Sequence, residues 1–268
     1  MNRIDRHFTA LRKTGKKAFV AYITAGDHSL DVTASLVREF EKSGVDAVEL
    51  GVPFSDPLAD GAVNQSAADR ALRSGTSLAG ILRTVEKLRR EGAQIPLILF
   101  TYFNPIHRYG LKRFVTDAAK AGVDGVLYLD LPPEESGECL DLMESAGLHA
   151  IHLVSPTTPD ARLARIVRRA RGFIYYVSRE GVTGMQSKLQ GGIAANVARI
   201  RRCTKLPLVI GFGISTPAQV KSAASFADGC VVGSVIVKRI GELQGKPGLA
   251  RQVAALVRRL AAPLKTIS

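Results

Sequence analysis

The sequence predicts an α/β protein, a single-domain (β/α)8 TIM barrel that spans residues 1–268. Short apolar runs alternate with longer amphipathic segments along the whole chain, and no long linker or change in composition divides it. Its 268 residues also agree with the length of about 250 that such barrels commonly have as one domain. An open, doubly wound sheet is the less favoured alternative, because no G-x-G-x-x-G motif follows the first apolar run.

Eight apolar runs have the length and composition of buried strands. None of them contains Lys or Arg. The runs are AFVAYIT from residue 18, DAVELG from 46, PLILFTY from 96, GVLYLD from 125, HAIHLV from 149, GFIYYVS from 172, LPLVIGF from 206 and GCVVGS from 229.

The segments between these runs have the apolar spacing of amphipathic helices. Several close with Gly, which suits a left-handed C-cap, and the endings KSGVDAVEL and KAGVDGVLY indicate helices that return to the next parallel strand. Helices are expected at 31–44, 77–92, 111–122, 133–147, 160–172 and 216–227.

The net charge of +13 favours anionic partners in principle, such as phosphorylated substrates. The Lys and Arg residues are spread along the chain, however, and those of 160–172 fall opposite its apolar residues, as on the solvated face of a helix. Trp is absent and no nucleic-acid motif occurs, so we do not expect a nucleic-acid-binding protein.

No stretch approaches the roughly 18 consecutive apolar residues of a membrane span, and the chain begins without the apolar run of a signal peptide. We therefore expect a cytoplasmic protein with no membrane partner. Cys139, Cys203 and Cys230 are odd in number, far apart and lack C-x-x-C spacing, so neither a disulfide framework nor a metal site is indicated.

The second expected strand carries a carboxylate toward the barrel interior. Strand alternation puts Val45, Ala47 and Glu49 on one face. Val48 and Leu50, on the other face, suit the helix layer. Glu49 therefore points inward at the C-terminal end of its strand, where barrels place their active sites.

Glu49 is expected to have a raised pKa, because burial disfavours its charged form and a nearby Asp60 would add repulsion. A general acid/base near neutrality needs its pKa raised by about 2, which corresponds to about 3 kcal/mol. Asp56 and Asp60 follow in the loop PFSDPLADGAVNQ. Either can be a turn residue, and Asp60 can also cap a following helix, so the residues alone leave both open.

Gly and small polar residues recur after the last three expected strands, in SREGVTG, GFGIS and VVGS. Backbone N–H groups exposed by Gly, together with a helix N-terminus, bind phosphate, and barrels often place this site after strands seven and eight. Ordinary tight turns are the alternative for each loop, but three in succession favour a phosphorylated substrate. The candidates are Gly184, Gly213, Gly233 and Ser234.

Apolar and aromatic residues of inward parity gather at the same end of the expected barrel. They would line a pocket suited to a flat ring. Together with the phosphate-binding loops, this pocket predicts a ligand that has a flat apolar end and an anionic tail. These residues are Tyr22, Phe100, Tyr102, Leu127, Leu129, Leu153 and Tyr175.

Several motifs of the sequence resemble those of a known family. ELGVPFSDPLADG followed by NQ, with AYITAGD before it and TYFNPI, LDLP, SREGVTG, GFGIS and VVGSVIV after it, resemble in order and spacing the tryptophan synthase alpha chain, over residues 17–263. The resemblance implies cleavage of indole-3-glycerol phosphate to indole and D-glyceraldehyde 3-phosphate in tryptophan biosynthesis. It implies neither a metal nor an organic cofactor in this chain.

The resemblance also implies roles for single residues. Glu49 would protonate the indole ring carbon and accept the glycerol hydroxyl proton, Asp60 would bind the indole N–H, and Tyr175 would assist. Thr183 and Gly184 would lie in a loop that closes over substrate, with Thr183 hydrogen-bonded to Asp60. Ring contacts are implied for Phe100 and Phe212, and phosphate contacts for Gly213, Gly233 and Ser234.

The family's partner is a pyridoxal-phosphate-dependent beta chain, which joins the indole to serine. An alpha2-beta2 heterotetramer is therefore implied. Pro53, Asp56, Asn104 and Pro105 match the surface that faces this partner.

The chain departs from the usual family pattern at several positions, which leave the catalytic set intact but leave partner affinity open. Asn64 stands where an apolar residue is usual, and the sequence offers no physical reason for it. The other departures are Ala21 and His28 where Pro is common, Ala62, again at a Pro position, and His107 and Arg108 in the partner-facing loop.

Three alternatives remain. The chain could be a catalytically weak alpha chain that mainly activates a beta chain, although the intact Glu49 and Asp60 argue against this. It could be a free-standing indole-3-glycerol-phosphate lyase. Another phosphate-binding barrel, such as indole-glycerol-phosphate synthase, would be expected to carry a catalytic Lys at a strand end, and none of the eight runs offers one.

Overall fold

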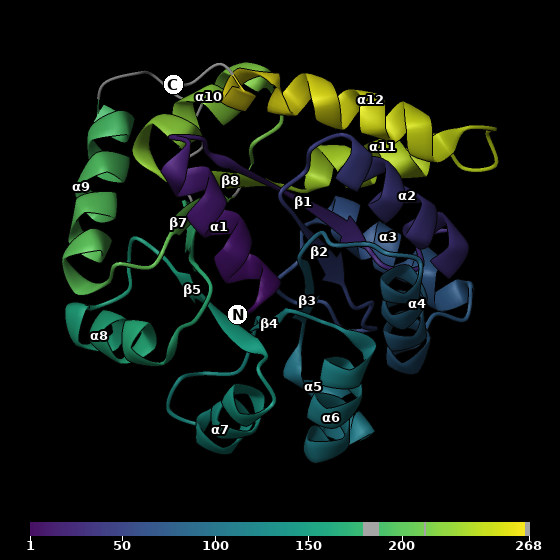
Figure 1. Ribbon diagram of the computed structural model, residues 1–268, viewed down its shortest axis with the longest axis horizontal. Coiled ribbons are helices and arrows are strands. Elements are labelled where there is room, and N and C mark those ends of the chain that lie inside the picture. Colours follow the sequence, from purple (N-terminus) through teal and green to yellow (C-terminus); the bar gives the residue numbers. More distant parts are fainter. Residues whose placement is uncertain (179–187, 212, 266–268) are drawn as a thin grey trace.

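Eight parallel strands, paired in chain order and closed by the pairing of β8 with β1, form a barrel surrounded by helices (Figure 1). The computed structural model describes residues 1–178, 188–211 and 213–265. The predicted barrel is confirmed and the open sheet is wrong. Thr183, Gly184 and Phe212 lie outside the described residues.

Each of the eight predicted runs contains one strand. The strands are shorter than most of the runs, because the residues at the run ends belong to the loops. They are β1 (Ala18–Thr24), β2 (Ala47–Gly51), β3 (Leu97–Thr101), β4 (Gly125–Tyr128), β5 (His149–Val154), β6 (Ile174–Val177), β7 (Leu208–Gly211) and β8 (Gly229–Val232).

The six predicted helices are present with ends that differ by a few residues, and Gly44 and Gly122 end two of them with φ of 76° and 87°, the left-handed conformation that Gly adopts readily. These helices are α2 (Leu30–Lys42), α4 (Leu78–Arg90), α6 (Leu111–Ala121), α7 (Gly137–Ser145), α8 (Asp160–Arg169) and α10 (Pro217–Phe226). The structure adds α1 (Arg3–Lys13), α3 (Ala62–Arg73), α5 (Phe103–Tyr109), α9 (Lys188–Cys203), α11 (Ser234–Glu242), α12 (Leu249–Ala261) and the 3-10 helix η1 (Ala262–Lys265).

The core has two parts, as strand alternation requires. Val48 and Leu50 belong to the larger cluster between strands and helices, and Ala47 belongs to the cluster inside the barrel. Val45 was predicted to share the inner face but packs in the outer cluster, because β2 begins only at Ala47 and alternation does not extend before it.

Helix α1 covers the N-terminal end of the barrel and crosses in front of it in Figure 1. Its fully buried Ile4 and nearly buried Phe8 pack against the interior cluster. Beside them, Asp124 is almost fully buried and accepts hydrogen bonds from Arg3 at 3.0 Å and Arg89 at 2.6 Å. This carboxylate therefore ties α1 and α4 to the strands.

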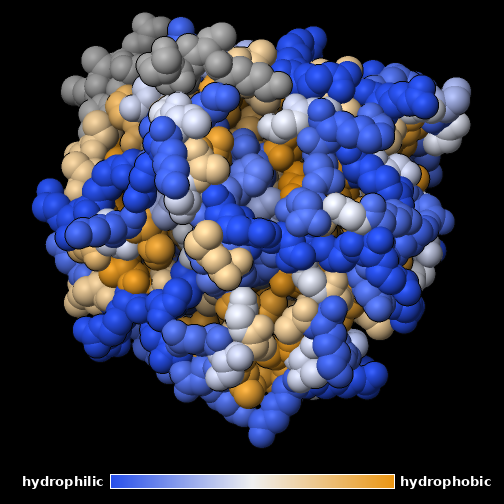
Figure 2. Space-filling model, viewed as in Figure 1, coloured by the Kyte–Doolittle hydropathy of each residue, from blue (hydrophilic) through white to orange (hydrophobic). Residues whose placement is uncertain are grey.

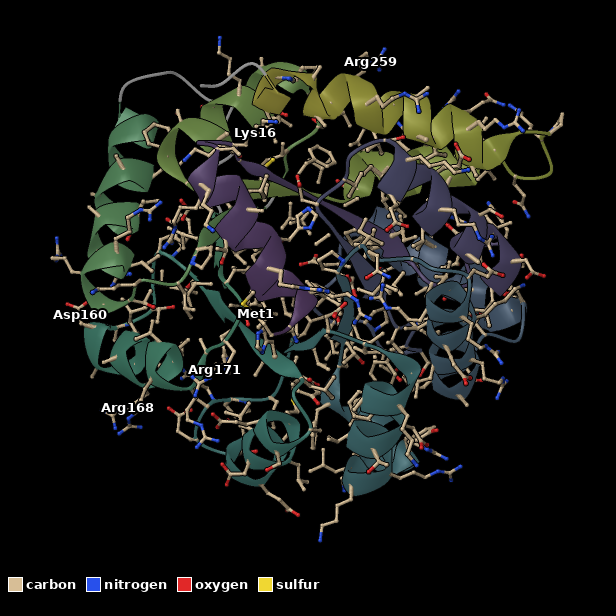
Figure 3. All side chains as sticks on the ribbon, in the orientation of Figure 1. Met1, Lys16, Asp160, Arg168, Arg171 and Arg259 are labelled. Atoms are coloured by element: carbon tan, nitrogen blue, oxygen red, sulfur yellow. The ribbon has the colours of Figure 1, made fainter. Side chains whose placement is uncertain are left out.

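The surface on the α1 side is largely hydrophilic, with small separate apolar areas (Figure 2). Arg168 of α8 and Arg259 of α12 project outward from different parts of the rim (Figure 3). These positions agree with the prediction that the basic residues are dispersed. Within 1–178, 188–211 and 213–265, no helix is long and apolar enough to cross a membrane.

We predict that Asp124→Ala lowers the free energy of unfolding by about 3 kcal/mol, because it leaves the buried Arg89 without its charged partner. Urea denaturation measures this change. The matched control is Asp31→Ala, which removes an exposed ion pair with Lys87 and should cost less than about 1 kcal/mol. Equal effects of the two substitutions would contradict this account of the Asp124 cluster.

Candidate active site

A cavity of about 510 Å³ opens at the C-terminal ends of the strands, where the sequence predicted the site. Predicted site residues from β1, β2, β3, β6 and the loops after β2, β7 and β8 line it together. They are Tyr22, Glu49, Asp60, Phe100, Tyr175, Gly213, Gly233 and Ser234, joined by Leu129 and Leu153.

Glu49 is the third residue of β2 and lies opposite Tyr22 in the register with β1. Its side chain is fully buried, and neither carboxyl oxygen has a hydrogen-bond partner among the described residues. Burial raises the pKa of Glu49 from 4.5 to about 8. The expected rise is confirmed, but burial alone causes it and repulsion from Asp60 does not contribute.

Tyr22 and Tyr175 cross the ends of neighbouring strands, and glycine makes room for them. A Cβ atom at Gly51 would lie 2.3 Å from the Tyr22 hydroxyl, and one at Gly211 would lie 2.1 Å from the Tyr175 hydroxyl. Burial, reinforced by the charge of Glu49, holds the pKa of Tyr175 well above its usual value. Tyr175 is therefore a neutral hydroxyl that can donate a hydrogen bond near Glu49.

Asp60 lies just before α3, and each of its carboxylate oxygens accepts one hydrogen bond. The Tyr102 hydroxyl donates to Oδ2 at 3.0 Å, and the Asn64 amide donates to Oδ1 at 3.5 Å. Burial raises the pKa of Asp60, while these two hydrogen bonds lower it. The N-cap of α3 is Gly61, which makes no side-chain cap, so the possibility that Asp60 caps this helix is wrong.

Tyr102 was predicted to line the ring pocket, but its hydroxyl instead accepts a hydrogen bond from the Ala59 backbone at 2.9 Å and donates to Asp60. Its ring packs against Phe54, with 5.3 Å between the ring centroids. Tyr102 thus fixes the acidic loop against β3. The sequence did not reveal this contact, because parity places a side chain on a face but does not say what its end touches.

The phosphate candidates lie together because β7 and β8 are paired, with Gly211 opposite Val231. Gly213, with φ of 68°, follows β7, and Gly233 is the N-cap of α11, whose first residue is Ser234. The first N–H groups of a helix have no acceptor within it, so this end of the cavity can bind an anion. Within the part of the chain that the structure describes, no three His, Cys, Asp or Glu side chains gather to hold a metal ion.

The residues predicted to face a partner differ in exposure. Asp56 and Asn104 are exposed, Pro105 is partly buried and Pro53 is buried. Leu58 in the same loop as Asp56 is 93% exposed, which is unusual for a large apolar side chain and was not singled out from the sequence.

A model of the tryptophan synthase alpha chain family matches residues 8–265. The chain belongs to this family. The tryptophan synthase alpha chain of Geotalea daltonii is 49% identical over 265 residues, which cover 98% of this chain and 100% of the relative. The family's function is cleavage of indole-3-glycerol phosphate by the lyase subunit of tryptophan synthase, so the predicted family and function are confirmed.

Solved structures of tryptophan synthase alpha chains have the same fold. The subunit from Legionella pneumophila strain Paris is 38% identical, covers 100% of both chains and superposes with a TM-score of 0.92. An aminoacrylate-bound tryptophan synthase structure from M. tuberculosis contains a chain that is 31% identical, with a TM-score of 0.87 and coverage of 98% of this chain and 100% of that one.

We predict that Glu49→Gln stabilises the protein more at high pH than at low pH. The unfolded carboxyl ionises near pH 4.5 and the folded one near 8, so folding is penalised increasingly across this window. Gln has no such penalty. Between about pH 5.5 and about pH 9 the stability of the variant relative to the parent should rise by about 3 kcal/mol, at about 1.4 kcal/mol per pH unit.

Urea denaturation at the two pH values measures this difference. Glu86→Gln is the matched control, because Glu86 is exposed on α4 and water solvates its carboxylate. If Glu49→Gln had the same effect at both pH values, Glu49 would titrate alike in the folded and unfolded chains.

Proposed function

We propose that this cavity cleaves indole-3-glycerol phosphate with Glu49 as the proton-transfer group, Asp60 as the partner of the ring N–H and Tyr175 as an assisting hydrogen-bond donor. One observation carries the proposal. A fully buried carboxyl with no partner among the described residues and a pKa of about 8 lies in the same cavity as a second carboxylate that two side chains hold by hydrogen bonds.

The reaction needs one proton to be given and one to be taken. Protonated Glu49 donates to the ring carbon that bears the glycerol side chain, and the ring nitrogen becomes positively charged. The ionised Glu49 then accepts the proton of the adjacent side-chain hydroxyl. As the C–C bond breaks, its electron pair returns to the ring and the hydroxyl carbon becomes the aldehyde of glyceraldehyde 3-phosphate. Glu49 ends protonated, as it began.

Asp60 supplies the charge that this sequence of steps requires. An ionised carboxylate beside the ring N–H stabilises the cationic ring, and low polarity inside the cavity strengthens that interaction. Tyr102 and Asn64 favour the ionised form of Asp60, whereas Glu49 has no donor among the described residues and favours its neutral form. The two carboxyl groups therefore suit opposite tasks at one pH.

The rest of the cavity accommodates the remainder of the substrate. Tyr22 and Phe100, whose rings meet edge to face with centroids 5.0 Å apart, offer an apolar wall to the indole. Gly213, Gly233 and Ser234, from the loops after β7 and β8, would hold the phosphate. Thr183, Gly184 and Phe212 remain predictions, since they lie outside the described residues.

The proposed chemistry uses only acid–base and hydrogen-bonding groups of this chain, and pyridoxal phosphate is expected only in a beta chain. We propose that such a chain docks on the loop after β2 and on α5, in an alpha2-beta2 assembly. The exposed Leu58, Asp56 and Asn104 support this surface, because they leave one apolar and two polar side chains free to contact a partner.

The first test is to incubate the purified chain with indole-3-glycerol phosphate, alone and with a cognate beta chain, and to measure indole. We expect release that Glu49→Gln abolishes and Asp60→Asn lowers by about 100-fold or more, with the substrate affinity and the folded structure of Glu49→Gln nearly unchanged. An active Glu49→Gln variant would disprove its assigned role. No release under either condition would disprove the proposed function.

The second test concerns the partner. Leu58→Ser should weaken binding to the beta chain by about tenfold, because it removes an apolar contact from the interface. Titration calorimetry measures the affinity. Leu72→Ser is the matched control, since Leu72 is 37% exposed on α3, outside the proposed surface. Unchanged affinity of Leu58→Ser would place the interface elsewhere.

A further inference from the structure

Asn64 is the third residue of α3, and its side chain lines the cavity. It lies one helical turn after Asp60, so its amide reaches back to the carboxylate. The Nδ2–Oδ1 distance of 3.5 Å is at the long end of the hydrogen-bonding range. The sequence alone gave no reason for a polar residue at position 64. The hydrogen bond to Asp60 is such a reason.

The orientation of the Asn64 amide is determined by this contact. Its Oδ1 atom is buried and has no hydrogen-bond partner among the described residues. If the amide were turned over, Oδ1 would face the Asp60 carboxylate, oxygen against oxygen. The amide therefore keeps its N–H toward Asp60 although its own carbonyl is left unpaired, which an apolar residue of the same size would avoid.

Apart from Asn64, two side chains of the described residues form hydrogen bonds with Asp60. Its backbone carbonyl accepts a hydrogen bond from the Gln65 side chain at 2.8 Å, and its Oδ2 accepts from Tyr102. Among the described residues, the titratable groups that face it are the Tyr22 hydroxyl from β1 and the Tyr102 hydroxyl after β3. Across the described residues no Lys or Arg forms an ion pair with Asp60. Among the described residues, Asn64 is the side chain that donates to Oδ1.

We propose that Asn64 is a positioning residue that holds Oδ1 of Asp60 while Tyr102 holds Oδ2, so that the carboxylate stays ionised and oriented toward the ring N–H of the substrate. The inference rests on the proposed function, because it assigns Asn64 a task in the same site. Burial disfavours the ionised form of Asp60. Two hydrogen-bond donors counteract this effect of burial more strongly than Tyr102 alone would.

Two substitutions of nearly the same size separate this role from packing. Asn64→Leu removes the donor, and Asn64→Asp replaces it with a like charge. The acidic limb of the pH profile of kcat/KM for indole release should move to higher pH in Asn64→Leu and further in Asn64→Asp. At about pH 6 the Leu variant should lose roughly 3- to 10-fold in kcat/KM, and much of this loss should disappear at higher pH.

The matched control is Asn196→Leu. Asn196 is also partly buried on a helix and donates its side-chain amide, but to the Gly192 backbone carbonyl in α9, outside the cavity. It should leave the profile unchanged. A loss in Asn64→Leu that is equal at all pH values, or an unshifted acidic limb, would overturn the positioning role.

A measurement without turnover keeps the inference separate from the proposed function. Carbon-13 NMR of the Asp carboxyl groups, assigned with Asp60→Asn, follows the titration of Asp60 in the free protein. Its pKa should rise in Asn64→Leu whether or not the chain releases indole. An unchanged Asp60 titration would refute the role of Asn64, whereas a raised pKa in a chain that releases no indole would refute only the proposed function.

Discussion

The burial of one unpartnered carboxyl, that of Glu49, is the constraint on which the site depends. A closed barrel excludes water from its interior, and the eight strands contain no Lys or Arg that could neutralise an anion there. The carboxyl is therefore neutral at neutral pH, at a cost to stability that grows between about pH 4.5 and about pH 8. Burial keeps Tyr22 and Tyr175 in the same cavity neutral as well, so a single proton can move in surroundings of low polarity.

The contrast between Glu49 and Asp60 shows how few contacts are needed to give two carboxyl groups different protonation states. Both are removed from water to a large degree, and burial acts on both in the same direction. Asp60 receives two side-chain donors at the edge of the cavity, and Glu49 receives none among the described residues. A β strand is well suited to bury a side chain without donors, whereas a loop next to a helix can bring several donors together.

Strand parity is what made the sequence informative. It placed Glu49, Tyr22 and Phe100 in one cavity, because the side-chain period of two holds throughout a strand. It was misleading for Val45, which precedes β2. The contacts of Tyr102 and Asn64 with Asp60 could not be predicted, since loops have no period and hydrogen bonds depend on distances of tenths of an ångström. Helix α1 was missed although Ile4, Phe8 and Leu11 have helical spacing, because that stripe is narrow.

The position of α1 has a practical consequence for handling the protein. Met1 is 87% exposed and precedes a helix that covers the N-terminal end of the barrel, while the cavity opens at the C-terminal ends of the strands. A support or label attached through Met1 would therefore lie at the N-terminal end of the barrel, the face turned to the viewer in Figure 3. The cavity mouth would point away from the support. Immobilised in this way, the chain would keep both its substrate entrance and its exposed Leu58 loop accessible to molecules in solution.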